Sequence, residues 1–260
     1  MAELDGHIAM DKNLYNRALK AMLAMAVATF IPTSFIKVPY GRHSRPGWGP
    51  SISPRLAWFL MESPTLWMSA LLFPHGRMSS NPTSLILLMP FLAHYIHRCC
   101  IYPLRIRSGS KPLPISIAAM AFLFNTYNTY LQIRWISHYG NYTAGWLGSP
   151  MFIAGLLVFI TGMIINLWAD SVLLSLRREN EGYKIPRGGL FEYVSCPNYF
   201  GEIVEWLGWA LMTWSLAGLS FFLYTAANLG PRAAVHHDWY HEQFPERYPK
   251  SRKALIPFVY

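Results

Sequence analysis

The stretch MFIAGLLVFITGMIINLWADSVL, residues Met151–Leu173, decides the fold. Its first part is almost wholly apolar, and the run exceeds the roughly 20 residues that a helix needs to cross a bilayer. Asn166 and Asp170 interrupt it four residues apart, so they share one helical face. Such a polar face avoids lipid and turns to a protected interior. The stretch therefore predicts a membrane helix that lines a polar site inside a helical bundle.

The composition of the whole chain agrees with a membrane location. Of 260 residues, 53% are hydrophobic and 13% are charged, and the mean hydropathy is +0.21. Soluble domains carry about a quarter charged residues. The net charge of +9 comes from short basic clusters between apolar runs, which is typical of loops that face anionic lipid. We therefore predict no nucleic-acid partner.

Apolar runs of membrane-spanning length recur along the chain and predict an all-α protein with seven transmembrane helices. The last two runs are joined near Ser215 and should form a tight hairpin. The predicted spans are Ala18–Phe35, Leu56–Phe73, Ser84–Tyr102, Ile115–Ile136, Met151–Leu173, Tyr199–Trp214 and Ala217–Leu229.

Lysine and arginine residues orient the predicted helices. If the segment after the first span is cytoplasmic, 17 of the 22 Lys and Arg residues lie in cytoplasmic loops or the tail. Arg77 and Arg134 lie on the other side, and Lys12, Arg17 and Lys20 precede the first span and oppose the assignment. The bias predicts an outside or lumenal N-terminus and a cytoplasmic C-terminus, in a bacterial inner membrane or the endoplasmic reticulum.

Polar and charged side chains inside the spans are the candidates for a functional site. An isolated Asn125 or Gln132 could equally form a hydrogen bond that joins two helices and have no other role. Arg134 fits the membrane edge better, and His94 or His97 alone is more often a satisfied bundle residue. Glu62 needs either a proton or a partner. The full set comprises Glu62, His94, Tyr95, His97, Arg98, Asn125, Asn128, Gln132, Arg134, Asn166, Asp170, Glu202 and Glu205.

A basic, glycine-containing loop at Tyr183–Glu192 lies on the predicted cytoplasmic side. Arg232, His236 and Tyr240 follow, each four residues apart on one helix face. Basic groups beside glycine suit a phosphorylated cofactor, and by composition alone the loop could equally bind lipid head groups. Dinucleotide-fold and P-loop motifs are missing from the sequence. The three cysteines lack metal-ligand spacing, so neither a metal site nor a structural disulfide is predicted.

Several unusual strings give the chain a resemblance to the steroid 5α-reductase family. They run in register from about residue 38 to 260, and three further stretches, at 46–50, 61–67 and 195–199, are most similar to the plant brassinosteroid-pathway branch. The matching strings are VPYGRH (38–43), AWFLMESP (57–64), HYIHR (94–98), residues 162–170, YKIPRGGLFE (183–192), NYFGE (198–202), EW (205–206) and YPKSRKALIPF (248–258).

The resemblance implies one membrane domain over residues 1–260, whose cofactor half is about 150–260, with a cavity for cofactor and substrate. It implies NADPH-dependent reduction of the C4–C5 double bond of a 3-oxo-Δ4 steroid, without an obligate protein partner. Glu62 and Tyr95 match the catalytic pair at the 3-oxo group. The matching cofactor positions are Trp58, Arg98, Tyr102, Asn166, Asp170, Arg177, Asn198, Glu202, Arg232, His236 and Tyr240.

One position departs from the mammalian pattern. Met120 stands where the mammalian steroid enzymes have an arginine near the D-ring end, so an apolar lining and a sterol side chain are expected there. The alternatives are an enone reductase acting on a polyprenoid or enoyl thioester, a non-catalytic lipid-binding or transport protein, and a methyltransferase. The chain lacks the repeats that many transporters show.

Overall fold

The structure is a computed structural model of the 260-residue chain. It describes the backbone of residues 2–38, 41–107, 109–178 and 182–260, and the side chains of 11–38, 41–107, 109–176 and 182–260. Pro39, Tyr40 and the side chain of Arg177, which belong to the predicted motifs and sites, lie outside the described residues.

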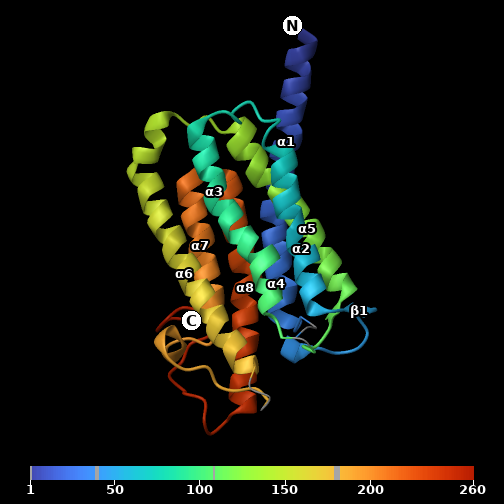
Figure 1. Cartoon of the computed structure of the whole chain (residues 1–260), viewed down its shortest axis with the longest axis vertical. Coiled ribbons are helices and arrows are strands. Elements are labelled where there is room, and N and C mark those ends of the chain that lie inside the picture. Colours follow the sequence, from blue (N-terminus) through green and yellow to red (C-terminus); the bar gives the residue numbers. More distant parts are fainter. Residues whose placement is uncertain (1, 39–40, 108, 179–181) are drawn as a thin grey trace.

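Long helices occupy every predicted span, and Figure 1 shows them side by side in one bundle. They are α1 (Ala2–Phe35), α2 (Pro54–Leu72), α3 (Pro82–Ile96), α5 (Ile115–Arg134), α6 (Pro150–Arg178), α7 (Pro197–Thr213) and α8 (Leu216–Gln243), and the short α4 (Tyr102–Arg105) continues the line of α3.

Short elements join and extend these helices. A π-helical turn at His97–Ile101 links α3 to α4, and a second one at Trp135–Tyr139 follows α5. Strands β1 (Ser51–Ile52) and β2 (Leu113–Pro114) pair antiparallel, with Ser51 opposite Pro114. Single 3₁₀ turns lie at Gly41–His43, Ala144–Gly148 and Gly189–Glu192.

Two predicted boundaries were wrong. Helix α1 begins well before Ala18, and its N-terminal end extends beyond the bundle in Figure 1. Helix α8 continues past Leu229 to Gln243 and carries Pro231 inside it. The end of α8 was predicted too early because its later turns are polar. These turns face other protein segments and the cavity described below.

The tight hairpin predicted near Ser215 is confirmed. Trp214 adopts a left-handed conformation with φ 41°, and Ser215 caps α8 by accepting a hydrogen bond from the Gly218 amide at 2.9 Å. Side-chain capping of this kind satisfies an otherwise unpaired amide at the helix start. The short turn holds α7 and α8 side by side.

Helices α6 and α7 are in closer contact than ordinary side chains allow. A Cβ atom added at Gly162 would lie 2.2 Å from the Glu205 backbone nitrogen, and one at Gly201 would lie 2.5 Å from the Asn166 backbone nitrogen. Small residues let membrane helices approach in this way. The contact fixes Asn166 of α6 against the first turns of α7, where Glu202 lies.

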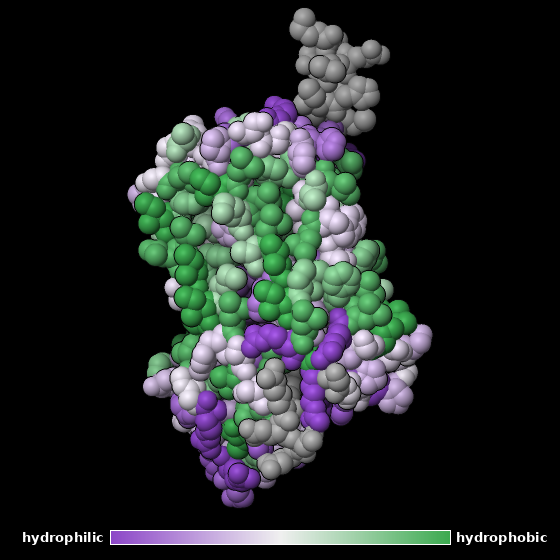
Figure 2. Space-filling model, in the orientation of Figure 1, coloured by the Kyte–Doolittle hydropathy of each residue, from purple (hydrophilic) through white to green (hydrophobic). Residues whose placement is uncertain are grey.

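The surface shows the polarity expected in a bilayer. In Figure 2 hydrophobic residues form a broad band around the middle of the visible face, and hydrophilic residues gather below it. Within the part of the chain that the structure describes, three helical segments are long and apolar enough to cross a membrane, namely Asp11–Phe35, Pro82–Arg105 and Pro150–Leu176. The chain is therefore a mostly helical membrane protein.

Candidate active site

A cavity of about 650 Å³ lies inside the bundle between α1, α2, α3, α5, α6, α7 and α8. This volume is within the range of small-molecule sites. Its lining includes eleven of the thirteen predicted site residues: Trp58, Glu62, Tyr95, Arg98, Tyr102, Asp170, Asn198, Glu202, Arg232, His236 and Tyr240. Asn166 lies behind the wall, and the side chain of Arg177 is not described.

Glu62 and Tyr95 come from neighbouring helices and face the same cavity. The Asn125 amide donates to Glu62 Oε2 at 3.0 Å and to the Met61 carbonyl at 2.7 Å. Asn125 thus orients the Glu62 carboxyl and also joins α5 to α2. The Tyr95 side chain is buried, and its ring lies 4.7 Å from that of Phe91 between centroids. Packing fixes the direction of the hydroxyl.

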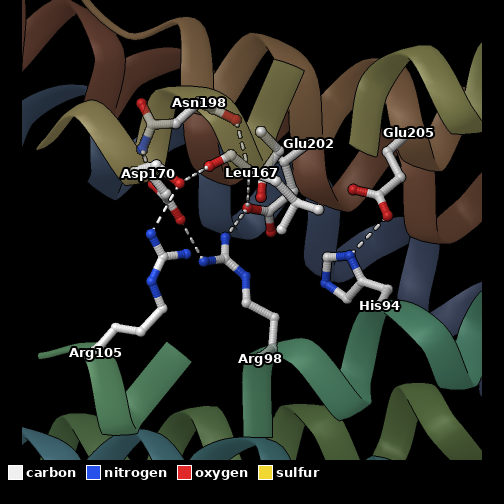
Figure 3. Close-up of polar contacts among 10 residues, drawn as sticks. His94, Arg98, Arg105, Leu167, Asp170, Asn198, Glu202 and Glu205 are labelled. Carbon is white, nitrogen blue, oxygen red and sulfur yellow. Dashed lines mark hydrogen bonds and ion pairs between the residues drawn. The ribbon is translucent and has the colours of Figure 1, made fainter. Parts of the chain in front are cut away.

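The cation Arg98 is held between two carboxylates (Figure 3). It donates to Asp170 Oδ2 at 2.8 Å and to Glu202 Oε2 at 2.5 Å. Its guanidinium also lies over Trp58 and Tyr102, at 5.5 and 5.2 Å from the ring centroids. Charge-assisted hydrogen bonds of this kind are short and strong.

Two asparagines complete this network. Asn198 donates to Asp170 Oδ1 at 3.1 Å. Asn166 donates to Glu202 Oε2 at 3.3 Å and to the Asn198 carbonyl at 2.9 Å. The shared face predicted for Asn166 and Asp170 is confirmed, because both side chains contact α7. Asn166 is not part of the cavity lining, but it holds Asn198 and Glu202, which are.

Antiparallel packing of α3 and α7 forms a second pair beside the network. His94 Nδ1 lies 2.8 Å from Glu205 Oε1, one turn along both helices from the Arg98–Glu202 pair. The spacing of four between His94 and Arg98 and of three between Glu202 and Glu205 makes both matches possible. The sequence alone favours a satisfied bundle residue for His94. The signal for its partner is that the basic residues of HYIHR (94–98) and the two glutamates of EIVE (202–205) have spacings that let them pair across two antiparallel helices.

At the end of the cavity lined by Arg42 and Arg232, here called its cationic end, a polar chain connects α7 and α8 to the loop after α1. Arg232 donates to the Tyr199 hydroxyl at 3.2 Å, and Tyr199 contacts His236 Nε2 at 3.1 Å. His236 Nδ1 in turn lies 3.2 Å from His43 Nε2. Partial burial and the neighbouring Arg42 lower the pKa of His43 to about 4. Sequence reasoning did not select Tyr199, His43 or Arg42.

Arg42 lies in an aromatic enclosure at this end. Its guanidinium is 4.5 Å from the Trp239 ring centroid and 4.7 Å from that of Tyr240, and Nη2 donates to the Tyr240 hydroxyl at 3.3 Å. Nη1 is buried and has no hydrogen-bond partner within the described part of the chain. An oriented cation with an unused donor fits an anionic group such as a phosphate. Arg232 is a further cavity cation, so the donor set suits a phosphorylated dinucleotide.

The basic loop at residues 183–192 lies outside the cavity wall. Arg252 is buried and donates to the Pro186 carbonyl at 3.0 Å and to Glu192 Oε2 at 3.3 Å. The Gly188 amide donates to Glu192 Oε1 at 2.6 Å. This amide first, and Arg252 in addition, hold the pKa of Glu192 below its usual range. The described residues of this loop thus fasten it to the C-terminal segment, and cofactor binding by the loop stays a prediction.

Comparisons with known proteins identify relatives along almost the whole chain. A family described as 3-oxo-5-alpha-steroid 4-dehydrogenase matches residues 111–260. Steroid 5-alpha-reductase DET2 of Arabidopsis thaliana is 54% identical over 257 residues, covering 96% of this chain and 98% of the relative. DET2 of Solanum lycopersicum is 53% identical, covering 96% and 98%. The 3-oxo-5-alpha-steroid 4-dehydrogenase 1 of Rattus norvegicus is 44% identical, covering 100% and 98%. The predicted resemblance is confirmed.

Proposed function

The chain belongs to the 3-oxo-5-alpha-steroid 4-dehydrogenase family, and on this premise we propose that it reduces the C4–C5 double bond of a 3-oxo-Δ4 steroid with NADPH. The observation that carries the proposal is the division of one cavity into two chemically different parts. Glu62 and Tyr95 present a hydroxyl and a carboxyl beside an apolar wall, and the Arg98 network together with Arg42 and Arg232 forms a charged part. A lipid with one carbonyl and an anionic planar cofactor would need these two parts.

The hydroxyl–carboxyl pair would activate the substrate. Hydride addition to C5 of an enone places negative charge on the 3-oxygen, and a positioned donor stabilises that charge. Tyr95 would donate to the oxygen, and Glu62, held by Asn125, would orient or share that proton. Bound NADPH would supply the hydride. The fixed position of both groups means that little reorganisation is needed during reaction.

The remaining predicted residues would hold the cofactor. Arg98 and its carboxylates present hydrogen-bonding groups to the cavity, and Trp58 and Tyr102 offer flat surfaces to planar rings. Arg232, His236 and Tyr240 would contact phosphate or sugar at the cationic end, where we add Arg42 because of its unused donor. Asn166 would position the network from behind the wall.

The apolar wall suits a steroid with an apolar side chain. Met120 lines the cavity with 54% of its surface exposed, next to Ala121 and Phe124 on α5. None of these three side chains can bind a polar 17-substituent. We propose that α5 contacts the end of the steroid farthest from the 3-oxo group.

We also propose that all seven long helices cross the membrane, with the N-terminus outside and the C-terminus cytoplasmic. This arrangement follows from the charge bias of the loops and places the cationic end of the cavity on the side where NADPH is available. A steroid dissolved in the bilayer could then reach the cavity between helices.

The proposal is tested with the full chain purified into lipid nanodiscs. Incubation with NADPH and progesterone, testosterone or a campestane enone should give the 5α-reduced product. Glu62→Gln and Tyr95→Phe should each abolish turnover while NADPH still binds. Wild-type rates in both variants would refute the assignment of the pair.

A matched control is Tyr130→Phe. Tyr130 also lies in a long helix and is partly buried, but it is outside the cavity wall. It should keep wild-type turnover. The absence of product from every enone, in protein that binds NADPH, would refute the steroid substrate class, and a polyprenoid or enoyl thioester would be tested next.

A further inference from the structure

The pair His94–Glu205 has no role in the steps above. Glu205 is fully buried, and His94 is 5% exposed. Glu205 Oε1 contacts His94 Nδ1 at 2.8 Å, and Oε2 is buried without a hydrogen-bond partner among the described residues. A buried carboxyl with one unused oxygen calls for a physical explanation.

Charge restricts the protonation of this pair. A bare carboxylate beside a neutral histidine would leave one net negative charge buried with an unsatisfied oxygen, which is costly. The neighbouring cation Arg98 is already shared by Asp170 and Glu202, so it offers little compensation. Two arrangements keep the pair neutral without placing an O–H on the unpartnered Oε2: a protonated Glu205 whose Oε1–H donates to His94 Nδ1, or an ion pair. Both place a proton on His94 Nε2.

The His94 ring lies in the wall of the cavity. His94 belongs to the cavity wall together with Tyr95, and the two rings lie 4.9 Å apart. In Figure 3 the second ring nitrogen points away from Glu205. Among the described residues no hydrogen bond is formed by Nε2, whereas Nδ1 is fixed by Glu205. The pair therefore directs one N–H donor into the space beside Tyr95.

We propose that the Glu205–His94 pair supplies the proton that enters the steroid at C4, an inference that rests on the proposed reduction. Hydride addition at C5 leaves an enolate, which needs a proton at C4 to become the saturated ketone. Tyr95 and Glu62 serve the oxygen, so the carbon needs another donor. His94 is the residue of the wall beside Tyr95 that has a donor directed into the cavity and a buried proton source behind it.

In the proton transfer to C4, each bond that forms is matched by one that breaks. The His94 Nε2–H bond breaks, and its proton forms the C4–H bond with the electron pair of the enolate double bond while the 3-oxo group re-forms. At the same time the Glu205 proton moves to Nδ1, or is already there in the ion pair. The pair ends as a carboxylate hydrogen-bonded to a neutral histidine, one proton poorer. Water entering after product release restores that proton.

The experiment follows the isotope at C4. Wild-type enzyme in nanodiscs, with NADPH and a steroid enone in D₂O, should place one deuterium on a single face of C4. His94→Gln and Glu205→Gln keep hydrogen bonding but cannot relay a proton. Each should lower kcat by about 100-fold or more, with little change in KM, and place deuterium on both faces because the enolate is then protonated by water.

The matched control is His97→Gln, on the same line of helices and outside the cavity wall. It should keep the wild-type rate and single-face labelling. Single-face deuterium at the wild-type rate in His94→Gln would overturn the proposal. If wild-type enzyme reduces no enone, the proposed function fails instead, so the two failures are distinguishable.

A second measurement needs neither cofactor nor turnover. Protein labelled with ¹⁵N-histidine should show His94 Nε2 bonded to hydrogen in the NMR spectrum, with the signal assigned by its loss in His94→Gln or, if that variant does not fold, in His94→Asn. A bare Nε2 in the wild-type protein would overturn the proposal whatever the kinetics of the variants.

Discussion

Gly162→Ala tests the close contact between α6 and α7. The added Cβ would lie 2.2 Å from the Glu205 backbone nitrogen, 2.6 Å from the Glu205 Cα and 2.6 Å from the Gly201 carbonyl oxygen. Ordinary contact begins at 3.4 Å, so the two helices must separate locally by about 1.2 Å. All three obstacles are backbone atoms, and a rotamer change cannot relieve them.

The expected cost lies at the upper end of the range for overpacking, about 3 kcal/mol. For a domain of this size 1 kcal/mol corresponds to about 2–4 °C in Tm, so Tm should fall by about 6–12 °C. Turnover should also fall, because separation of α6 from α7 moves Asn166 and Asp170 away from Asn198. Tm in detergent or nanodiscs and NADPH-dependent enone reduction measure the two effects.

Gly230→Ala is the control for this substitution. Gly230 also lies inside a helix, and a Cβ there would meet no atom within 4 Å apart from its chain neighbours and its own helix backbone. Alanine is the better helix former by about 0.5–1 kcal/mol, and contact with the ring of Pro231 offsets part of that gain, so Tm should change far less than in Gly162→Ala. Equal Tm values for Gly162→Ala and wild type would refute the inferred contact between the helices.

Three further predictions concern the cavity and its cationic end. Arg98→Met should lower stability by about 3–5 kcal/mol because the buried Asp170 and the partly buried Glu202 lose their cation; a thermal melt checks this, and an unchanged Tm would contradict the network. The pKa of His43 is about 4 in the folded protein against about 6.5 when unfolded, so the unfolded state binds more protons between these values. Stability should therefore fall as pH drops from 6.5 to 4, and less so in His43→Gln; parallel melting curves for both proteins would show that His43 does not contribute. Met120→Arg should shift kcat/KM by about tenfold or more from a campestane enone toward a steroid with a polar 17-substituent, and an unchanged ratio would place the steroid tail elsewhere.

The sequence by itself determined the helices and the chemical character of the site. Apolar runs placed every long helix, because a span of about 20 apolar residues has few other uses. Helical periodicity also placed Asn166 and Asp170 on one face, and Arg232, His236 and Tyr240 on another. The rare polar residues in the spans marked the cavity because a lipid environment excludes them.

Partners across helices were decided only by the tertiary structure. Periodicity says which side chains share a face, but it does not say which face of another helix they meet. Arg98 meets Asp170 and Glu202, and His94 meets Glu205, only because α3, α6 and α7 pack at a particular register. Arg134, expected at the membrane edge, pairs with Asp11 of α1 at 3.1 Å for the same reason.

In the loop at residues 183–192 the sequence likewise predicts the kinds of side chain, and the packing decides their partners. Its basic and glycine residues suggested a phosphate site, but the described part fastens to the C-terminal segment through Arg252. Composition identified the charged groups of this loop but not the residues that they contact. Contacts that join residues 60 or more positions apart depend on how the whole chain packs, and this is why the motifs were predictable while the pairing of His94 with Glu205 was visible only in the folded protein.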